Sequence, residues 1–108
     1  MIKVGINGYG TIGKSVADAV AMQKDMKLAG VTAHSYSFNT EVAKQKGYKI
    51  FALSAEASSE LKSNGMNPDG DINNLLDEVD LIVDATPKKV GQDNIENLYR
   101  PKKIKAIV

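Results

Sequence analysis

The sequence predicts an α/β domain in which a mainly parallel, doubly wound sheet carries helices on both faces. Apolar runs of strand length alternate along the 108 residues with segments of helical periodicity. The first run, Ile2 to Ile6, stops at closely spaced glycines, and a helical pattern begins directly after them. A later run, Leu81 to Val83, is continuously apolar and rich in β-branched residues, which is typical of a central parallel strand covered on both faces.

The first elements form a single supersecondary unit. We predict a strand over residues 1–7, a helix over 11–23 and a second strand over 26–32, which together make one right-handed βαβ unit. After the second strand we predict a polar loop over 33–41, a short helix over 41–46 and a strand over 48–53. A helix capped by Ser58 or Ser59 and ending at 63, a turn over 67–70 and a short helix capped by Asp71 are predicted next. The chain is then predicted to continue with a strand over 81–83, a helix over 91–99 and a fifth strand over 104–108.

The glycines after the first strand are the main candidate for a ligand site. Gly8, Gly10 and Gly13 fit the pattern G-x-G-x-x-G, in which the first permits a tight turn, the second lets a pyrophosphate approach and the third lets the helix pack closely. The amides of Thr11 and Ile12 would then face the phosphates at a helix N-terminus. Glycine clusters also serve ordinary turns, but the strand before and the helix after favour a Rossmann-type, dinucleotide-binding domain over residues 1–108.

The end of the second strand decides which dinucleotide is expected. An NAD-specific site usually has an acidic residue about 20 residues after the glycines, and this strand ends without one. Thr32, His34 and Ser35 can all donate hydrogen bonds, so we expect that NADP is not disfavoured against NAD. Tyr36 and Phe38 could flank an adenine or anchor the loop to the core.

A second wall of the site is predicted after the strand over 81–83. In open α/β sheets, ligands bind beyond the carboxyl ends of the strands, so Ala85 and Thr86 are expected to line the cofactor groove opposite the glycines. The alternative is that Thr86-Pro87 simply starts the next helix, since proline is favoured at an early helical position.

Composition excludes several other classes of function. The net charge is +1, with 14 basic and 13 acidic residues mixed along the chain, so the sequence predicts no positively charged surface that would bind nucleic acid or an acidic membrane. There is no cysteine and one histidine, His34, so we expect no metal site, disulfide or thiol nucleophile within these residues. The chain has no stretch of roughly 18 apolar residues and begins with a strand, which predicts a cytoplasmic protein.

Several blocks resemble the N-terminal half of the archaeal type of glyceraldehyde-3-phosphate dehydrogenase. They are Gly5-Ile6-Asn7-Gly8-Tyr9-Gly10-Thr11-Ile12-Gly13-Lys14, Val16-Ala17-Asp18-Ala19-Val20, Gly47-Tyr48-Lys49, Asp84-Ala85-Thr86-Pro87-Lys88-Lys89-Val90-Gly91 and Tyr99-Arg100-Pro101-Lys102. The resemblance implies an oxidoreductase of glycolysis or gluconeogenesis that binds NADP or NAD, with backbone contacts from Thr11 and Ile12. It also implies the parent reaction, in which glyceraldehyde 3-phosphate is oxidised with phosphate through a thioester.

Departures from the family pattern limit what this chain is expected to do alone. Ala33 to Ser37 stands where the family has a lysine-rich segment for the adenosine 2′-phosphate, and Ser15 replaces an arginine. The resemblance puts the catalytic cysteine, the histidine base and the substrate-phosphate site in a domain absent from this chain, so no residue here receives a catalytic role. The alternatives are a stand-alone dinucleotide-binding or sensing module and a scaffold without cofactor affinity. The apolar strand over 104–108 further predicts a homo-oligomer.

Overall fold

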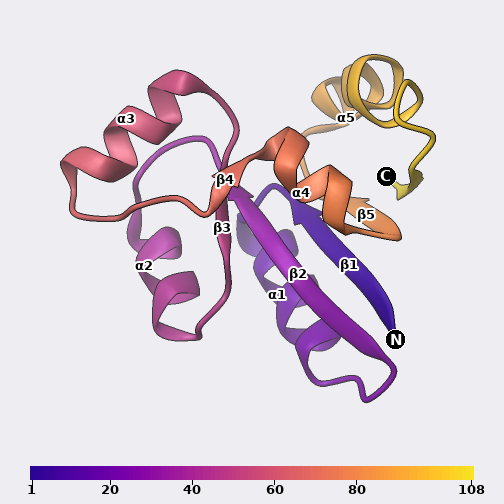
Figure 1. Cartoon of the computed structure of the whole chain (residues 1–108), viewed down its shortest axis with the longest axis horizontal. Helices are drawn as coiled ribbons and strands as arrows, with labels where there is room; N and C mark the ends of the chain where they lie inside the picture. The colour runs from indigo at the N-terminus through magenta and orange to yellow at the C-terminus, as the bar shows by residue number, and fades with distance from the viewer.

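The computed structural model describes residues 1–108 and contains one six-stranded sheet (Figure 1). The strands are β1 (Ile2–Asn7), β2 (Met26–Ala33), β3 (Ile50–Ala52), β4 (Gly70–Asp71), β5 (Leu81–Asp84) and β6 (Lys105–Ile107). Their order is β4-β3-β2-β1-β5-β6, and every adjacent pair is parallel. The order reverses at β1, which lies between β2 and β5, so the predicted doubly wound, Rossmann-type α/β class is confirmed.

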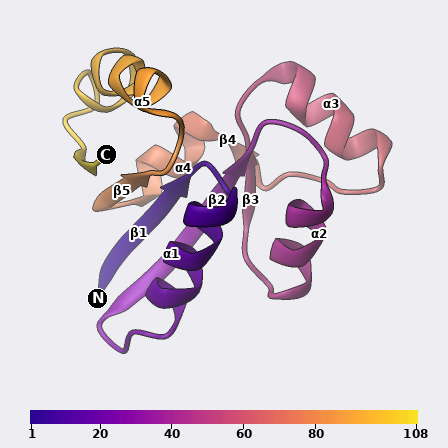
Figure 2. The ribbon, with the colours of Figure 1, turned by 180° about the vertical axis from the view of Figure 1, so that it is seen from behind.

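Helices cover both faces of this sheet. They are α1 (Thr11–Ala21), α2 (Phe38–Gln45), α3 (Ala55–Ser63), α4 (Ile72–Glu78), α5 (Lys88–Asn94) and the π-helical segment η1 (Ile95–Tyr99). Buried residues of α1, α2 and α3 pack against one face, and those of α4 and η1 pack against the other. Accordingly α4 lies in front of the sheet in Figure 1, whereas α1 lies in front of it in Figure 2.

The two cores explain the uninterrupted apolar runs of the central strands. Ile50 and Ala52 of β3 belong to the core beneath α1 to α3, while Phe51 between them belongs to the core beneath α4 and η1. Successive residues of a strand point to opposite faces, so a strand covered on both faces needs apolar residues at every position.

Two helices begin earlier than the sequence predicts. Helix α2 starts at Phe38, inside the expected loop, where the Ser37 amide donates to the Thr40 hydroxyl at 3.0 Å. Helix α3 starts at Ala55, because the Ser54 hydroxyl accepts the Ala57 amide at 3.1 Å and caps it. The expected caps of α3, Ser58 and Ser59, therefore lie within the helix.

Two further segments differ from expectation. The predicted turn over 67–70 leads into β4, a two-residue strand that pairs with β3 and that has no apolar signal in the sequence. The helix expected over 91–99 begins at Lys88, directly after Pro87 as its N-cap, and its last part is the π-helical η1. None of the helices combines the length and the apolar character that crossing a membrane would require.

Candidate functional site

A groove of about 570 Å³ opens at the carboxyl edge of the sheet, where β1, β2 and β5 end. This is the point at which the strand order reverses, and ligands of open α/β sheets bind there. Seven of the ten predicted site residues line the groove: Gly8, Gly10, Thr32, His34, Ser35, Ala85 and Thr86. The other three, Thr11, Ile12 and Gly13, form the first turn of α1 beside it.

The three glycines of the motif meet different steric conditions. Gly8 has a φ of +102°, which L side chains rarely adopt, and a Cβ there would also lie 3.1 Å from the Ala85 carbonyl carbon. A Cβ on Gly13 would lie 1.8 Å from the Gly8 carbonyl oxygen, so α1 packs directly on the turn. A Cβ on Gly10 would meet nothing within 4 Å. The protein itself does not require glycine at position 10, and a ligand approaching the backbone would.

The N-terminus of α1 has no side-chain cap. Gly10 occupies the N-cap position, and the first turn carries no acidic residue. By contrast, the side chains of Ser54 and Asp71 cap α3 and α4. The first amides of a helix have no partner within the helix, so those of Thr11 and Ile12 are available to an anion, and the helix dipole favours one.

The end of β2 supplies one buried hydroxyl and two accessible polar side chains. Thr32 is fully buried; its hydroxyl accepts the Gly8 amide at 2.9 Å and donates to the Asn7 Oδ1 atom at 2.8 Å. Its only proton is therefore used within the chain, so the Thr32 hydroxyl has no proton left to donate to a ligand in the groove. His34 is exposed and Ser35 is half-buried, so both can reach a ligand in the groove.

The two aromatic residues after β2 have different environments. Tyr36 packs against the core, and its hydroxyl donates to the Glu41 Oε1 atom at 2.6 Å. It anchors the loop, as one of the two interpretations predicted. Phe38 is 78% exposed at the start of α2 and packs in neither core.

The end of β5 forms the opposite wall and is held by the Asp84 carboxylate. The Thr86 amide donates to the Asp84 Oδ1 atom at 2.9 Å, and the Thr86 hydroxyl donates to the same oxygen. The other oxygen, Oδ2, accepts from Asn94 at 2.9 Å and from the Tyr99 hydroxyl. Burial alone would raise the pKa of Asp84, but these hydrogen bonds outweigh it and lower the pKa below the ordinary value.

Thr86 and Pro87 line the groove, and Pro87 also occupies the N-cap position of α5, so the two interpretations of this segment do not exclude each other. Asn7 and Tyr99, whose side chains lie behind the groove, are not among the residues predicted from the sequence. Asn7 is a polar residue at the end of a buried strand, a signal that could have been recognised; its Nδ2 atom donates to the Tyr99 hydroxyl at 2.8 Å. Tyr99 has no comparable signal, because its partner is 92 positions away.

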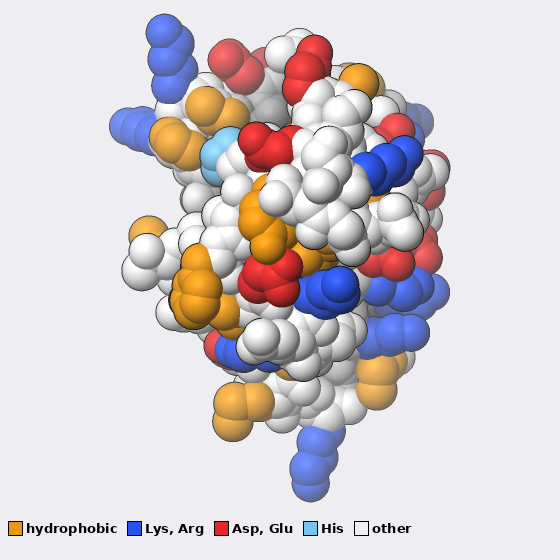
Figure 3. Space-filling view, turned by 90° about the vertical axis from the view of Figure 1, so that its left-hand side faces the viewer, with side chains coloured by type: hydrophobic (Ala, Val, Ile, Leu, Met, Phe, Trp, Pro, Cys, Tyr) orange, Lys and Arg blue, Asp and Glu red, His pale blue; other side chains and the backbone are white.

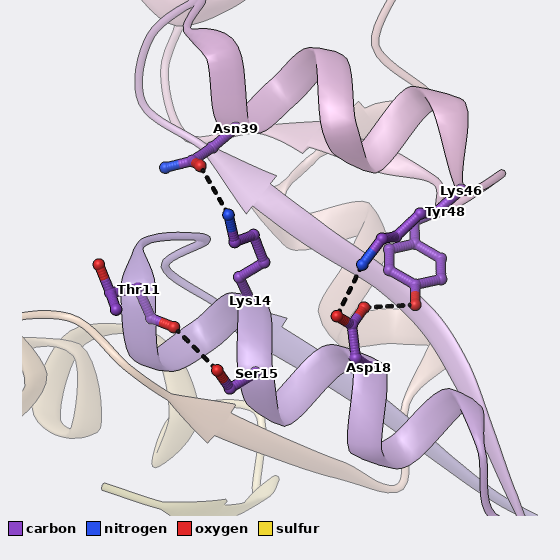
Figure 4. A network of polar contacts seen from close by, with 7 residues as sticks. All are labelled: Thr11, Lys14, Ser15, Asp18, Asn39, Lys46 and Tyr48. Atoms are coloured by element: carbon purple, nitrogen blue, oxygen red, sulfur yellow. Dashed lines mark hydrogen bonds and ion pairs between the residues drawn. The ribbon is translucent and has the colours of Figure 1, made fainter.

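Polar contacts hold α1 in place on its side facing α2 (Figure 4). The Lys14 Nζ atom lies 3.4 Å from the Asn39 Oδ1 atom, so a positive charge lies beside a residue of the groove. Asp18 forms an ion pair with Lys46 at 2.6 Å and accepts the Tyr48 hydroxyl at 2.7 Å. The hydrogen bonds from Lys46 and then Tyr48 lower the pKa of Asp18, and burial together with Asp18 raises the pKa of Tyr48 to about 12.

The surface charges are mixed in sign. On the face shown in Figure 3, acidic and basic side chains are interspersed, and the only histidine of the chain, His34, is exposed. No group of three or more His, Cys, Asp or Glu side chains is arranged to hold a metal ion. The groove is likewise lined by no acidic side chain, so nothing in its lining repels a phosphate.

A family model described as dihydrodipicolinate reductase, N-terminus, matches residues 2–108. Among solved structures, apo histidine-tagged saccharopine dehydrogenase (L-Glu forming) from Saccharomyces cerevisiae superimposes with a TM-score of 0.60. The alignment covers 98% of this chain and 21% of that chain at 20% sequence identity, which supports the fold alone.

Curated relatives confirm the resemblance that the sequence blocks predicted. Glyceraldehyde-3-phosphate dehydrogenase of Methanothermobacter thermautotrophicus is 49% identical over 107 residues, covering 99% of this chain and 32% of that protein. The enzymes of the same name from Methanocaldococcus jannaschii and Methanococcus maripaludis (strain C7) are 45% and 44% identical over 108 residues, covering 98% and 100% of this chain. The chain spans about a third of the length of these relatives, 32% in each case.

Proposed function

The chain belongs to the family described as dihydrodipicolinate reductase, N-terminus, and we propose that it is the NADP- or NAD-binding domain of a glyceraldehyde-3-phosphate dehydrogenase. One observation carries the proposal: the groove lies where the strand order reverses, beside the uncapped N-terminus of α1. A phosphate-bearing ligand is the chemistry that this combination suits.

The residues around the groove fit a dinucleotide. The amides of Thr11 and Ile12 would hold the pyrophosphate, and Gly10 leaves the space that a close approach needs. His34 and Ser35 would contact the adenosine ribose from the end of β2. Ala85 and Thr86 would form the opposite wall, together with Pro87 and Val90, which also line the groove.

The reaction of the whole protein is proposed from its relatives, which are named glyceraldehyde-3-phosphate dehydrogenase. In that reaction a bound nicotinamide cofactor would supply the hydride acceptor for the oxidation of glyceraldehyde 3-phosphate. This domain would contribute the position and the electrostatic environment of the cofactor. The chain contains no cysteine, so the thiol that such an oxidation uses is not among its residues.

The choice between the two cofactors follows from the charges near the end of β2. No acidic side chain lines the groove, and Lys14 lies next to Asn39, so a 2′-phosphate meets no repulsion. Ala33 to Ser37 stands where the archaeal glyceraldehyde-3-phosphate dehydrogenases that this chain resembles have lysines. Only neutral donors and one lysine, Lys14, are therefore available to that phosphate. A charge-assisted hydrogen bond is roughly twice as strong as a neutral one, so we expect NADP and NAD to differ in affinity by less than about tenfold.

Titration calorimetry of the purified chain with NADP and NAD tests the proposal. Replacement of Gly10 by leucine fills open space in front of α1, so the variant should fold normally and lose binding. Ala21→Leu places the same leucine side chain at the exposed far end of α1 and should bind like the wild type. Wild-type affinity in folded Gly10→Leu would contradict the site, and a wild-type chain that binds neither cofactor would contradict the function.

A further inference from the structure

A row of buried hydrogen bonds runs across the ends of three strands behind the groove. The Gly8 amide donates to the Thr32 hydroxyl at 2.9 Å, and this hydroxyl donates to the Asn7 Oδ1 atom at 2.8 Å. The Nδ2 atom of Asn7 donates to the Tyr99 hydroxyl at 2.8 Å, and that hydroxyl in turn donates to Asp84. Asn7 and Asp84 are direct partners in the pairing of β1 with β5. The row therefore joins β2, β1 and β5 through side chains as well as through the backbone.

The donor and acceptor groups of the row determine the direction of its hydrogen bonds. The Nδ2 group of Asn7 can only donate, so the Tyr99 oxygen accepts there, and the single proton of Tyr99 is left for Asp84. The Asp84 carboxylate then accepts the amide and hydroxyl of Thr86 on its other oxygen. One end of the row is thus the glycine turn and the other is the opposite wall of the groove.

Tyr99 is the link that comes from outside the site. It belongs to η1, and no residue of η1 lines the groove. Its side chain is only 1% exposed, and its ring packs in the core beneath α4 and η1. We propose, building on the function proposed above, that Tyr99 is a positioning residue for the dinucleotide: its hydroxyl sets the spacing between the Gly8 turn and the Asp84 to Thr86 wall.

Stability alone does not account for this hydroxyl. Apolar side chains at Asn7, Asp84 and Tyr99 together would avoid the desolvation cost of the row, whereas phenylalanine at position 99 alone would leave Asn7 Nδ2 and Asp84 with one partner fewer. What the hydroxyl adds is a directional tie between two groove walls that are made of loop backbone. Ligand affinity is sensitive to such placement, because a misplaced wall must be moved before the ligand can make its contacts.

The test compares Tyr99→Phe with Ile95→Ala in the full 108-residue chain. Ile95 also lies on η1 and packs against the same core, but its side chain forms none of the hydrogen bonds of the row, so its truncation removes packing and leaves those hydrogen-bonding groups in place. Tyr99→Phe removes both hydrogen bonds of this hydroxyl. We expect it to raise the Kd for NADP roughly five- to tenfold, about the net contribution of a single hydrogen bond, at a temperature where the protein is fully folded. Ile95→Ala should lower the unfolding midpoint and leave this Kd unchanged.

Amide chemical shifts without any nucleotide give a second readout. In Tyr99→Phe the amide signals of Gly8 and Thr86 should both move, whereas in Ile95→Ala they should not. If the wild type binds NADP and Tyr99→Phe binds it equally well, or if both variants weaken binding alike, the inference is overturned and the proposed function stands. If the wild type binds neither NADP nor NAD, the proposed function falls and takes the inference with it.

Discussion

Replacing Gly13 by alanine is the sharpest test of how α1 is seated on the glycine turn. The new Cβ would lie 1.8 Å from the Gly8 carbonyl oxygen and 3.0 Å from its carbonyl carbon. Ordinary van der Waals contact begins at 3.4 Å, so helix and turn would have to separate by about 1.6 Å. The obstacle is backbone, and Gly8 is held at a φ of +102°, so neither side can yield as a flexible side chain would.

Two opposing effects decide the sign of the change. Alanine is favoured over glycine within a helix by about 1 kcal/mol. Overpacking of a rigid site typically costs about 1–3 kcal/mol and occasionally more, and a clash between two backbone segments belongs at the upper end of that range. The clash should prevail, and Gly13→Ala should be less stable than the wild type by about 2 kcal/mol, or roughly 10 °C in Tm.

Urea unfolding followed by circular dichroism measures this difference directly. Gly10→Ala is the matched control: a Cβ at position 10 meets nothing within 4 Å, so only the lower N-cap preference of alanine acts there and the stability should stay within about 1 kcal/mol of the wild type. A Gly13→Ala chain that is as stable as the wild type, or more stable, would refute the close packing of α1 on the turn.

Three other predictions concern acid stability, turnover and assembly. The pKa of Asp84 is lowered in the folded state, so its ionised form contributes stability above about pH 4, and this contribution is lost as the pH falls through the folded pKa. Urea unfolding at pH 3 and pH 7 should therefore show a smaller acid-induced loss of stability in Asp84→Asn than in the wild type. Equal losses of stability in the two proteins would contradict the assignment. The purified chain should not reduce either cofactor with glyceraldehyde 3-phosphate and phosphate, because it contains no cysteine; steady absorbance growth at 340 nm that is lost in His34→Ala would show a self-sufficient enzyme. Ile107 is 55% exposed on the edge strand β6, so light scattering should detect concentration-dependent self-association, and a strict monomer at high concentration would remove this expectation.

The parallel sheet and the glycine turn could be predicted from the sequence because each depends on neighbouring residues. The strand from Ile2 to Asn7 and the helix after Gly10 are set by local apolar periodicity and by glycine stereochemistry. The caps of α3 and α4 are local as well, yet only Asp71 was identified. Several serines compete around residues 54–59, and sequence pattern alone does not tell which hydroxyl meets a free amide.

Contacts between distant residues could not be predicted in the same way. The sequence predicts that Thr32 faces a ligand, but β2 pairs beside β1, so its hydroxyl accepts the Gly8 amide and gives its only proton to Asn7. Tyr99 was read as part of an ordinary helix, although it reaches Asn7 across 92 positions. The strand β4 has only two residues, and its place beside β3 comes from tertiary pairing rather than from propensity.

Mapping of amide chemical shifts during titration with NADP, and separately with NAD, tests the central claim most directly. If the groove binds a dinucleotide, the signals of the α1 N-terminus should move together with those at the ends of β2 and β5, namely Gly10, Thr11, Ile12, Gly13, His34, Ser35, Ala85 and Thr86. Amide signals at the amino ends of β1 and β2, the opposite edge of the sheet, such as those of Lys3 and Lys27, should not move. No movement with either cofactor, or movement confined to that opposite edge, would contradict the claim that this groove is a dinucleotide site.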